Sequence, residues 1–109
     1  MLEFIQSRGF TIRRDHLAGQ YAEEVLSQIE NDLLKNPEAG ALVPGTGGLR
    51  KARAADPTRN KGKRSGFRYM YLYVQRDGQI FLLLIYNKDE QDDLTAEQRK
   101  WLRENWERL

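Results

Sequence analysis

Apolar residues recur at helical spacing in one N-terminal stretch of the chain, between residues 20 and 36. The positions that follow one another at steps of four, three and four are Ala22, Leu26, Ile29 and Leu33. This spacing places them on one face and predicts an amphipathic helix. Asn36-Pro37 ends the helix, because the residue before a proline is pushed out of the α region. The preceding residues Leu2–Gln6 are interpreted as a short strand.

Three further strands are predicted in the second half of the chain. Leu49–Ala54 carries alternate basic residues, and Phe67–Gln75 is rich in the aromatic residues that strands favour. Ile80–Tyr86 is a continuous apolar run, as expected of a central strand covered on both faces. Between the last two strands, Asp77-Gly78 is the signal of a two-residue hairpin turn.

A second helix is predicted to begin at Thr95, which forms a capping-box pattern with Gln98. Its apolar stripe consists of Trp101, Leu102, Trp106 and Leu109. The order of strand, helix, three strands and helix predicts an α+β fold, with an antiparallel sheet packed by helices. No repeat or linker divides the chain, so residues 1–109 are expected to form a single domain.

The composition excludes several kinds of chemistry. The 109 residues include no cysteine, which excludes disulfides, thiol nucleophiles and cysteine-bound zinc. The single histidine, His16, excludes a multi-histidine metal site and is interpreted as a surface residue. We therefore expect no metal and no cofactor. A group of carboxylates precedes the last helix, where acids complement the positive helix end, and we favour that role over metal binding: Asp89, Glu90, Asp92 and Asp93.

The chain also lacks sequence signals for a membrane or for export. No apolar run approaches the roughly 20 residues needed to span a bilayer. The N-terminal residues do not show the basic and then apolar order of a secretory signal. We expect a cytoplasmic protein with no membrane partner.

Positive charge is concentrated in the middle of the chain. Residues 50–68 contain eight basic residues and one acid, a net charge of +7, whereas residues 1–40 and 89–109 each carry −3. Such a field attracts polyanions, and each phosphate contact releases condensed counterions. We interpret the segment as a nucleic-acid-binding surface. An acidic protein partner and a solvated loop without a partner remain alternatives.

Alternation along the strands indicates which side chains share a face. In the aromatic strand, Arg68 shares a face with Met70 and Leu72, whereas Tyr69 and Tyr71 point to the other face. For these two tyrosines we favour a core role over a catalytic one. In the last strand, alternation predicts one shared face for Leu82, Leu84, Tyr86 and Lys88.

Arginine, lysine and tyrosine are the reactive side chains that this part of the chain offers. Arginine binds phosphate with two parallel hydrogen bonds and is always charged. Tyrosine and lysine transfer protons when neighbouring positive charge lowers their pKa values. Such a set around an RNA phosphate could promote attack by the ribose 2′-hydroxyl without a histidine, with the arginines stabilising the transition state.

Several segments resemble RelE/HigB-type toxins, over about residues 36–100. Pro44–Arg53 resembles the entry to the sheet of these toxins, and Asn60–Arg68 is similar to their basic loop and following strand. Phe81–Glu90 and Asp93–Thr95 match the last strand and the run into the C-terminal helix. The resemblance is greatest to the HigB branch of the RelE superfamily.

The resemblance implies a small RelE-like fold, with about three to four antiparallel strands packed against N-terminal helices and a C-terminal helix. It also implies the toxin of a type II toxin–antitoxin pair, a metal-independent endoribonuclease (mRNA interferase) that cleaves mRNA in the ribosomal A site and inhibits translation. The implied partners are the ribosome, its mRNA and a HigA-like helix-turn-helix antitoxin. Binding to a DNA operator is implied only through the antitoxin complex.

The functional residues of the family carry over where the positions match, and Arg68 corresponds to the phosphate-binding arginine. The residues implied to be catalytic are Arg64, Arg68, Tyr86 and Lys88. Those implied to bind RNA are Arg50, Lys51, Arg53, Arg59, Lys61 and Lys63. RelE itself has a further arginine and then a tyrosine where this chain has Asp89 and Leu94 or Thr95, as in the HigB branch. The general acid and base therefore stay open.

Two alternatives to a nuclease remain. A non-catalytic RNA- or ribosome-binding module on the same fold would arrest translation and leave the mRNA intact. A protein-interaction domain would dock an acidic partner through the basic segment and show no affinity for RNA at moderate salt.

Overall fold

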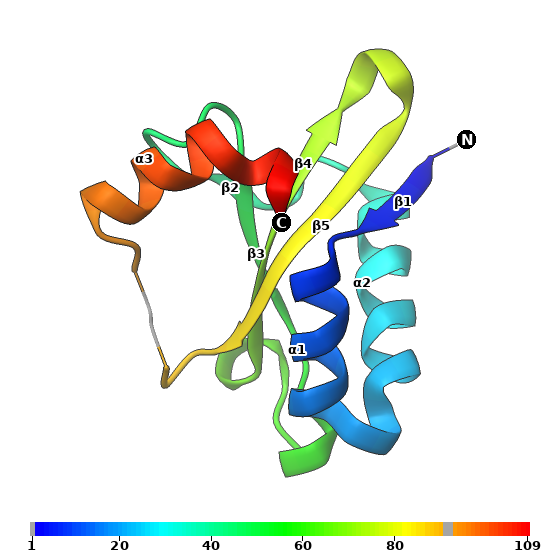
Figure 1. The fold of residues 1–109 in the computed structure, drawn as a ribbon. Helices are drawn as coiled ribbons and strands as arrows, with labels where there is room; N and C mark the ends of the chain where they lie inside the picture. Colours follow the sequence, from blue (N-terminus) through cyan, green and yellow to red (C-terminus); the bar gives the residue numbers. More distant parts are fainter. Residues whose placement is uncertain (1, 91–92) are drawn as a thin grey trace.

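The computed structural model describes residues 2–90 and 93–109, and a five-stranded sheet forms its centre (Figure 1). The strands are β1 (Glu3–Gln6), β2 (Ala41–Leu42), β3 (Arg50–Ala54), β4 (Phe67–Val74) and β5 (Gln79–Asn87). They lie in the order β1-β5-β4-β3-β2, and neighbours are antiparallel except that β1 runs parallel to β5. The sheet is therefore mixed and not antiparallel throughout as predicted, because β1 is parallel to β5, and it has one strand more than the sequence predicts, the short β2.

Helices cover both faces of this sheet and enclose two apolar cores. Helices α1 (Arg8–Ala18) and α2 (Ala22–Lys35) pack on one face, and α3 (Ala96–Asn105) packs on the other (Figure 1). The core beneath α1 and α2 includes Phe10, Val25, Ile29, Leu33, Tyr69, Tyr71 and Leu82. The core beneath α3 is formed around Leu49, Met70, Leu83 and Leu102. The predicted α+β fold class is confirmed.

The apolar pattern of the sequence misses α1 because the buried side of this helix is not wholly apolar. Its buried residues are Phe10, Arg14 and Ala18, four positions apart, so an arginine interrupts the stripe. Arg14 is 7% exposed and forms ion pairs with Asp15 and Glu23. By contrast, the buried face of α2 is continuous and apolar, and its predicted bounds are correct to within two residues.

The connection between β4 and β5 is longer than the Asp-Gly signal predicts. Val74 pairs with Gln79, so residues 75–78 form a four-residue loop. The loop is a 3₁₀ turn that ends at Gly78, whose φ of 62° lies in the left-handed region. Glycine adopts this conformation at no steric cost, which explains the signal although the loop is not a two-residue turn.

A bulge in β5 changes which residues face the two cores. Met70 pairs with Leu84, but Tyr71 pairs with Leu82, so Leu83 is an extra residue. Because of the bulge, the side chain of Leu82 lies in the core beneath α1 and α2, whereas those of Leu84 and Tyr86 lie on the α3 side of the sheet. The prediction that Leu82 shares a face with Tyr86 is therefore wrong, because strict alternation does not hold through a bulge.

The C-terminal helix begins as predicted. Thr95 accepts from Gln98 N–H at 3.1 Å, and the Gln98 side chain accepts from Thr95 N–H at 2.9 Å, which completes the capping box. Trp106 and Leu109 pack in the core beneath α3, whereas Trp101 is 50% exposed. Within the described residues, the helices are too short or too polar to cross a membrane.

Candidate functional site

Three of the residues implied to be functional lie in one row across the sheet. Arg53 of β3 pairs with Arg68 of β4, and Arg68 pairs with Tyr86 of β5. Directly paired residues of antiparallel strands point to the same face, with Cα atoms about 4.5–5.5 Å apart. The next pair on that face, Met70 and Leu84, belongs to the core beneath α3. The row therefore lies on the α3 face of the sheet, where this core ends.

Two arginines that face each other across strands repel and destabilise a sheet. Within residues 2–90 and 93–109, neither Arg53 nor Arg68 forms an ion pair. Arg68 is only 4% exposed, and its guanidinium donates to the backbone carbonyls of Lys63 at 3.4 Å and Arg64 at 3.1 Å. The carbonyls orient the guanidinium but bring no negative charge, so the row is suited to bind an anion.

The carbonyls that hold Arg68 belong to the basic loop, residues 55–66, between β3 and β4. Asp56 anchors this loop and is 1% exposed. Its main chain exchanges two hydrogen bonds with Lys61, at 2.7 and 2.8 Å. Its carboxylate accepts hydrogen bonds from Thr58 and from Arg59. Burial acts to raise the pKa of Asp56, but these hydrogen bonds outweigh it and hold the pKa below its usual value.

Arg59 joins the basic loop to the end of β5. Its Nε donates to Asp56 Oδ2 at 2.7 Å, and its Nη2 donates to Asn87 Oδ1 at 3.3 Å. Its Nη1 lies 3.6 Å from Asp89 Oδ2. These contacts give Arg59 a structural role, and its role in RNA binding stays a prediction.

A cleft of about 880 Å³ opens beside the row. It lies at the end of β3 that β2 does not reach, because the short β2 pairs only with Arg50 and Lys51. Its charged lining residues are Asp32, Lys51, Arg53, Lys63, Arg64, Arg68 and Asp93. The cleft therefore gathers half of the predicted site residues at one place: Lys51, Arg53, Lys63, Arg64 and Arg68.

Acidic residues from distant segments neutralise part of the positive charge of the cleft. Lys63 Nζ lies 2.6 Å from Asp32 of α2, and Lys51 Nζ lies 3.4 Å from Asp93. The cleft cations that form no ion pair with a described residue are Arg53, Arg64 and Arg68. These three arginines are the strongest candidates for phosphate contacts.

The other predicted site residues lie outside the row. Arg50 and Arg53 are three residues apart in β3, so their side chains point to opposite faces of the sheet. Arg50 Nη1 donates to the carbonyls of Glu38 at 3.1 Å and Gly40 at 2.7 Å. Lys61 is exposed in the basic loop, beside a different hollow, and Lys88 is exposed directly after β5. Their predicted functions stay predictions.

The core role favoured for Tyr69 and Tyr71 is confirmed, since they are 1% and 0% exposed. Burial raises the pKa of both phenols. The Tyr71 hydroxyl donates to the Pro37 carbonyl at 2.8 Å and accepts from Gly40 N–H at 2.9 Å. These two phenols are therefore poor proton donors, and Tyr86 is the phenol that shares the row with the arginines.

The acidic residues after β5 make contacts that their positions in the sequence do not predict. Arg13 Nη2 of α1 donates to both carboxylate oxygens of Glu90, at 2.7 and 2.6 Å. The hydrogen bond from Asn87 N–H, helped by Arg13, holds the pKa of Glu90 below its usual value. With Asp89 and Asp93, Glu90 ties this segment to three elements, a role that sequence spacing does not show. Asp92 lies outside the described residues.

Potential metal ligands are scattered in the described part of the chain, where no group of three or more His, Cys, Asp or Glu side chains could hold a metal ion. His16, in the last turn of α1, is exposed. The surface role predicted for His16 is confirmed.

Comparison with known proteins places this arrangement on a known fold. No protein-family model matches the chain. A solved structure of a mutant of the E. coli toxin RelE in the free state is similar, with a TM-score of 0.60 and 14% sequence identity. The match covers 84% of this chain and 87% of that chain. The likeness therefore extends over nearly the whole molecule, and the chain has the α+β fold of the RelE toxin.

Proposed function

We propose that the protein is the toxin of a type II toxin–antitoxin pair, of the HigB branch, and acts as a ribosome-dependent mRNA endonuclease. The observation that carries the proposal is the row of Arg53, Arg68 and Tyr86, whose two arginines line a basic cleft. The similar solved structure is itself a toxin. The sequence resemblance supports the same activity.

The proposed reaction is cleavage of an RNA phosphodiester by the neighbouring ribose. The 2′-oxygen loses its proton and attacks phosphorus, and the bond from phosphorus to the 5′-oxygen breaks. The leaving 5′-oxygen takes up a proton, so the products are a 2′,3′-cyclic phosphate and a 5′-hydroxyl. The arginines of the row and Arg64 stabilise the negative charge that develops on the phosphate oxygens. Tyr86 and Lys88 are the candidates for the two proton transfers.

The proposal includes the partners that the resemblance implies. A HigA-like helix-turn-helix antitoxin neutralises the toxin, and the pair binds its DNA operator through the antitoxin. The substrate is mRNA in the ribosomal A site, in the cytoplasm. Neither a metal nor a cofactor takes part in the proposed reaction.

The test is cell-free translation of a reporter mRNA, with 5′ ends mapped by primer extension in the presence and absence of ribosomes. The wild type is expected to cut within codons, and only where ribosomes translate. Arg68→Ala is expected to lower cleavage by about 100-fold, because it removes a preorganised charge from the transition state. Arg53→Ala changes an exposed side chain and should lower cleavage without affecting the fold.

Two controls separate loss of function from loss of structure. Arg76→Ala removes an arginine that is 88% exposed at the far end of β4 and should cleave like the wild type. Thermal unfolding of Arg68→Ala measures the cost of losing its carbonyl contacts. Translation arrest with intact mRNA would instead favour the non-catalytic binding module, and full cleavage by both arginine variants would show that the site is wrong.

A further inference from the structure

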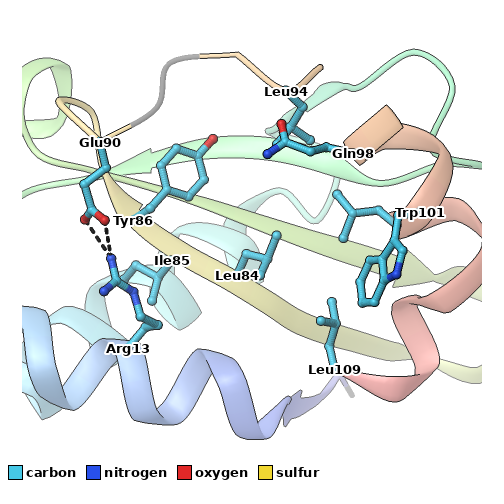
Figure 2. Close-up of a pocket in the computed structure, with 10 residues that line it drawn as sticks. Arg13, Leu84, Ile85, Tyr86, Glu90, Leu94, Gln98, Trp101 and Leu109 are labelled. Atoms are coloured by element: carbon cyan, nitrogen blue, oxygen red, sulfur yellow. Dashed lines mark hydrogen bonds and ion pairs between the residues drawn. The ribbon is translucent and has the colours of Figure 1, made fainter. Parts of the chain in front are cut away.

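A second hollow is lined by Tyr86, the residue that pairs with Arg68 in the row. It has a volume of about 500 Å³ and lies between β5, α1 and α3 (Figure 2). Its lining is mostly apolar and includes Leu84, Tyr86 and Trp101, with Arg13 and Glu90 at one end. Such concave, apolar pockets with a few polar groups are typical ligand sites.

Two aromatic side chains stand at this pocket. Tyr86 belongs both to the row with Arg68 and to the pocket wall. Trp101 also lines the pocket, and half of its surface is exposed, although the sequence predicts it as part of the apolar stripe of the last helix. Leu84 lies between them in Figure 2. A planar ligand could therefore enter between aromatic and aliphatic walls.

One end of the pocket is held in place by charge. Arg13 of α1 and Glu90 after β5 both line the pocket, and their ion pair of 2.6 Å joins the two elements (Figure 2). Glu90 also accepts from Asn87 N–H at 3.1 Å, which fixes the chain directly after Tyr86. The pocket therefore exists before a ligand binds and offers charged groups beside its apolar walls.

We propose that this pocket receives one unstacked nucleobase of the RNA strand whose phosphates lie on Arg53 and Arg68. This inference rests on the proposed function. Single-stranded RNA is recognised through splayed bases that stack on aromatic side chains, and Tyr86 connects the phosphate row directly to such a surface. The pocket then determines which base the protein prefers next to the phosphate that it binds.

The direct test compares two 2′-O-methyl oligoribonucleotides of equal length, one with all its bases and one with abasic residues at its centre. Both keep the phosphates that the row would bind, and neither can be cleaved by 2′-hydroxyl attack. We expect the wild type to bind the complete oligomer at least about fivefold more tightly, the effect of one base stacked on an aromatic ring. Trp101→Ala should reduce this ratio to nearly one without changing affinity for the abasic oligomer.

Three controls define the result. Trp101→Phe keeps an aromatic ring and should keep most of the preference. Leu42→Ala shortens another exposed apolar residue, 59% exposed on β2, and should behave like the wild type. In Trp106→Phe the remaining tryptophan is Trp101, and its fluorescence should change with the complete oligomer and not with the abasic one.

The outcomes distinguish this inference from the proposed function. Equal affinity of the wild type for both oligomers, or a preference that survives Trp101→Ala, would overturn the base pocket while leaving RNA binding intact. Failure of both oligomers to bind would overturn RNA binding itself, and the base pocket with it. Binding of both oligomers with unchanged Trp101 fluorescence would also overturn the assignment of a nucleobase to the pocket, and a protein partner would then be the alternative occupant.

The source of the base is tested in the translation reaction. If the base belongs to the mRNA, Trp101→Ala should flatten the base preference at the nucleotides beside the mapped cuts. A uniform fall in cleavage at all sites would show that the pocket contacts another RNA, such as that of the ribosome, and would overturn the assignment to the cleaved strand.

Discussion

At the scale of single residues, the unusual feature is the pairing of Arg53 with Arg68. Directly opposed like charges cost stability in a sheet, and a fold selected for stability alone would place an acid at one of the two positions. Here the Arg68 guanidinium is satisfied by carbonyl oxygens, which compensate its burial without cancelling its charge. Local rules of stability are commonly broken at functional sites, which is why we propose that the row binds phosphate.

Asp56 is the residue on which the conformation of the basic loop depends most. In Asp56→Asn the amide can still accept from Thr58 N–H, but it loses the charge that faces Arg59. We expect the variant to be less stable by about 1.5–3 kcal/mol at pH 7, the range for hydrogen bonds to charged groups. Urea unfolding of both proteins measures the difference.

The loss of stability caused by Asp56→Asn is expected to depend on pH. Because the folded protein lowers the pKa of Asp56, the contribution of this carboxylate is complete above its unfolded pKa and is lost as pH falls through the folded pKa. The stability gap between wild type and Asp56→Asn should therefore close below about pH 4. Asp77→Asn, a half-exposed acid paired with Arg76 beside it, is the matched control and should show a small gap. A gap that widened in acid would contradict the role given to Asp56.

The sequence predicted the charges of the site but not their pairing. The run of cations in residues 50–68 is visible in the composition, and Arg53, Arg64 and Arg68 are in it. Which cations are neutralised depends on acids remote in the chain, such as Asp32 for Lys63. No local pattern contains that information, since it arises only when α2 packs beside the basic loop.

At the scale of elements, strands β4 and β5 were predictable because aromatic and apolar residues mark them clearly, and β3 was predictable from its alternate basic residues. Helix α1 was not, because Arg14 interrupts its buried side. The bulge at Leu83 was not predictable either, since every residue around it is apolar and fits both faces. Without the bulge, Leu82 and Tyr86 would share a face, so the register that brings Tyr86 beside Arg68 could be read only from the structure.

The basic loop offers a test of how its shape supports the site. A Cβ on Gly66 would lie 2.2 Å from the Ala54 carbonyl oxygen, so Gly66→Ala must move the chain that carries the Lys63 and Arg64 carbonyls. We expect a loss of about 2 kcal/mol of stability and weaker RNA binding, because Arg68 loses its orientation. Chemical unfolding and oligomer affinity measure both effects.

Gly62→Ala, four residues earlier in the same loop, is the control. A Cβ there meets nothing within 4 Å, and its φ of −70° is open to any residue. The variant should keep full affinity and be equally stable or more stable by about 0.4–1 kcal/mol. If both glycine variants bound RNA like the wild type, the loop would not position Arg68 for binding.

At the scale of the whole molecule, acidic and basic residues are segregated along the sequence, and the fold brings some of them together in ion pairs. The acidic segment after β5 folds back on cations of three elements, through Glu90 with Arg13, Asp89 with Arg59 and Asp93 with Lys51. In the cleft, the pair of Asp93 with Lys51 and that of Asp32 with Lys63 leave the unpaired positive charge to a few arginines. The net charge of +2 therefore understates the local field that a nucleic acid would meet.

This separation predicts how RNA binding responds to salt. If Arg53, Arg64 and Arg68 each contact one phosphate, the logarithm of the association constant should fall against the logarithm of salt concentration with a slope of about −2, since each contact on a single strand contributes about −0.7. Arg53→Gln should reduce the slope to about −1.4. Arg76→Gln, which removes another exposed positive charge beyond the opposite end of β4, should leave it unchanged. Fluorescence anisotropy of a labelled 2′-O-methyl oligomer over a salt series gives the three slopes. Equal slopes for wild type and Arg53→Gln would mean that the row does not contact phosphate, whereas an equal drop in both variants would mean that RNA senses only the overall charge.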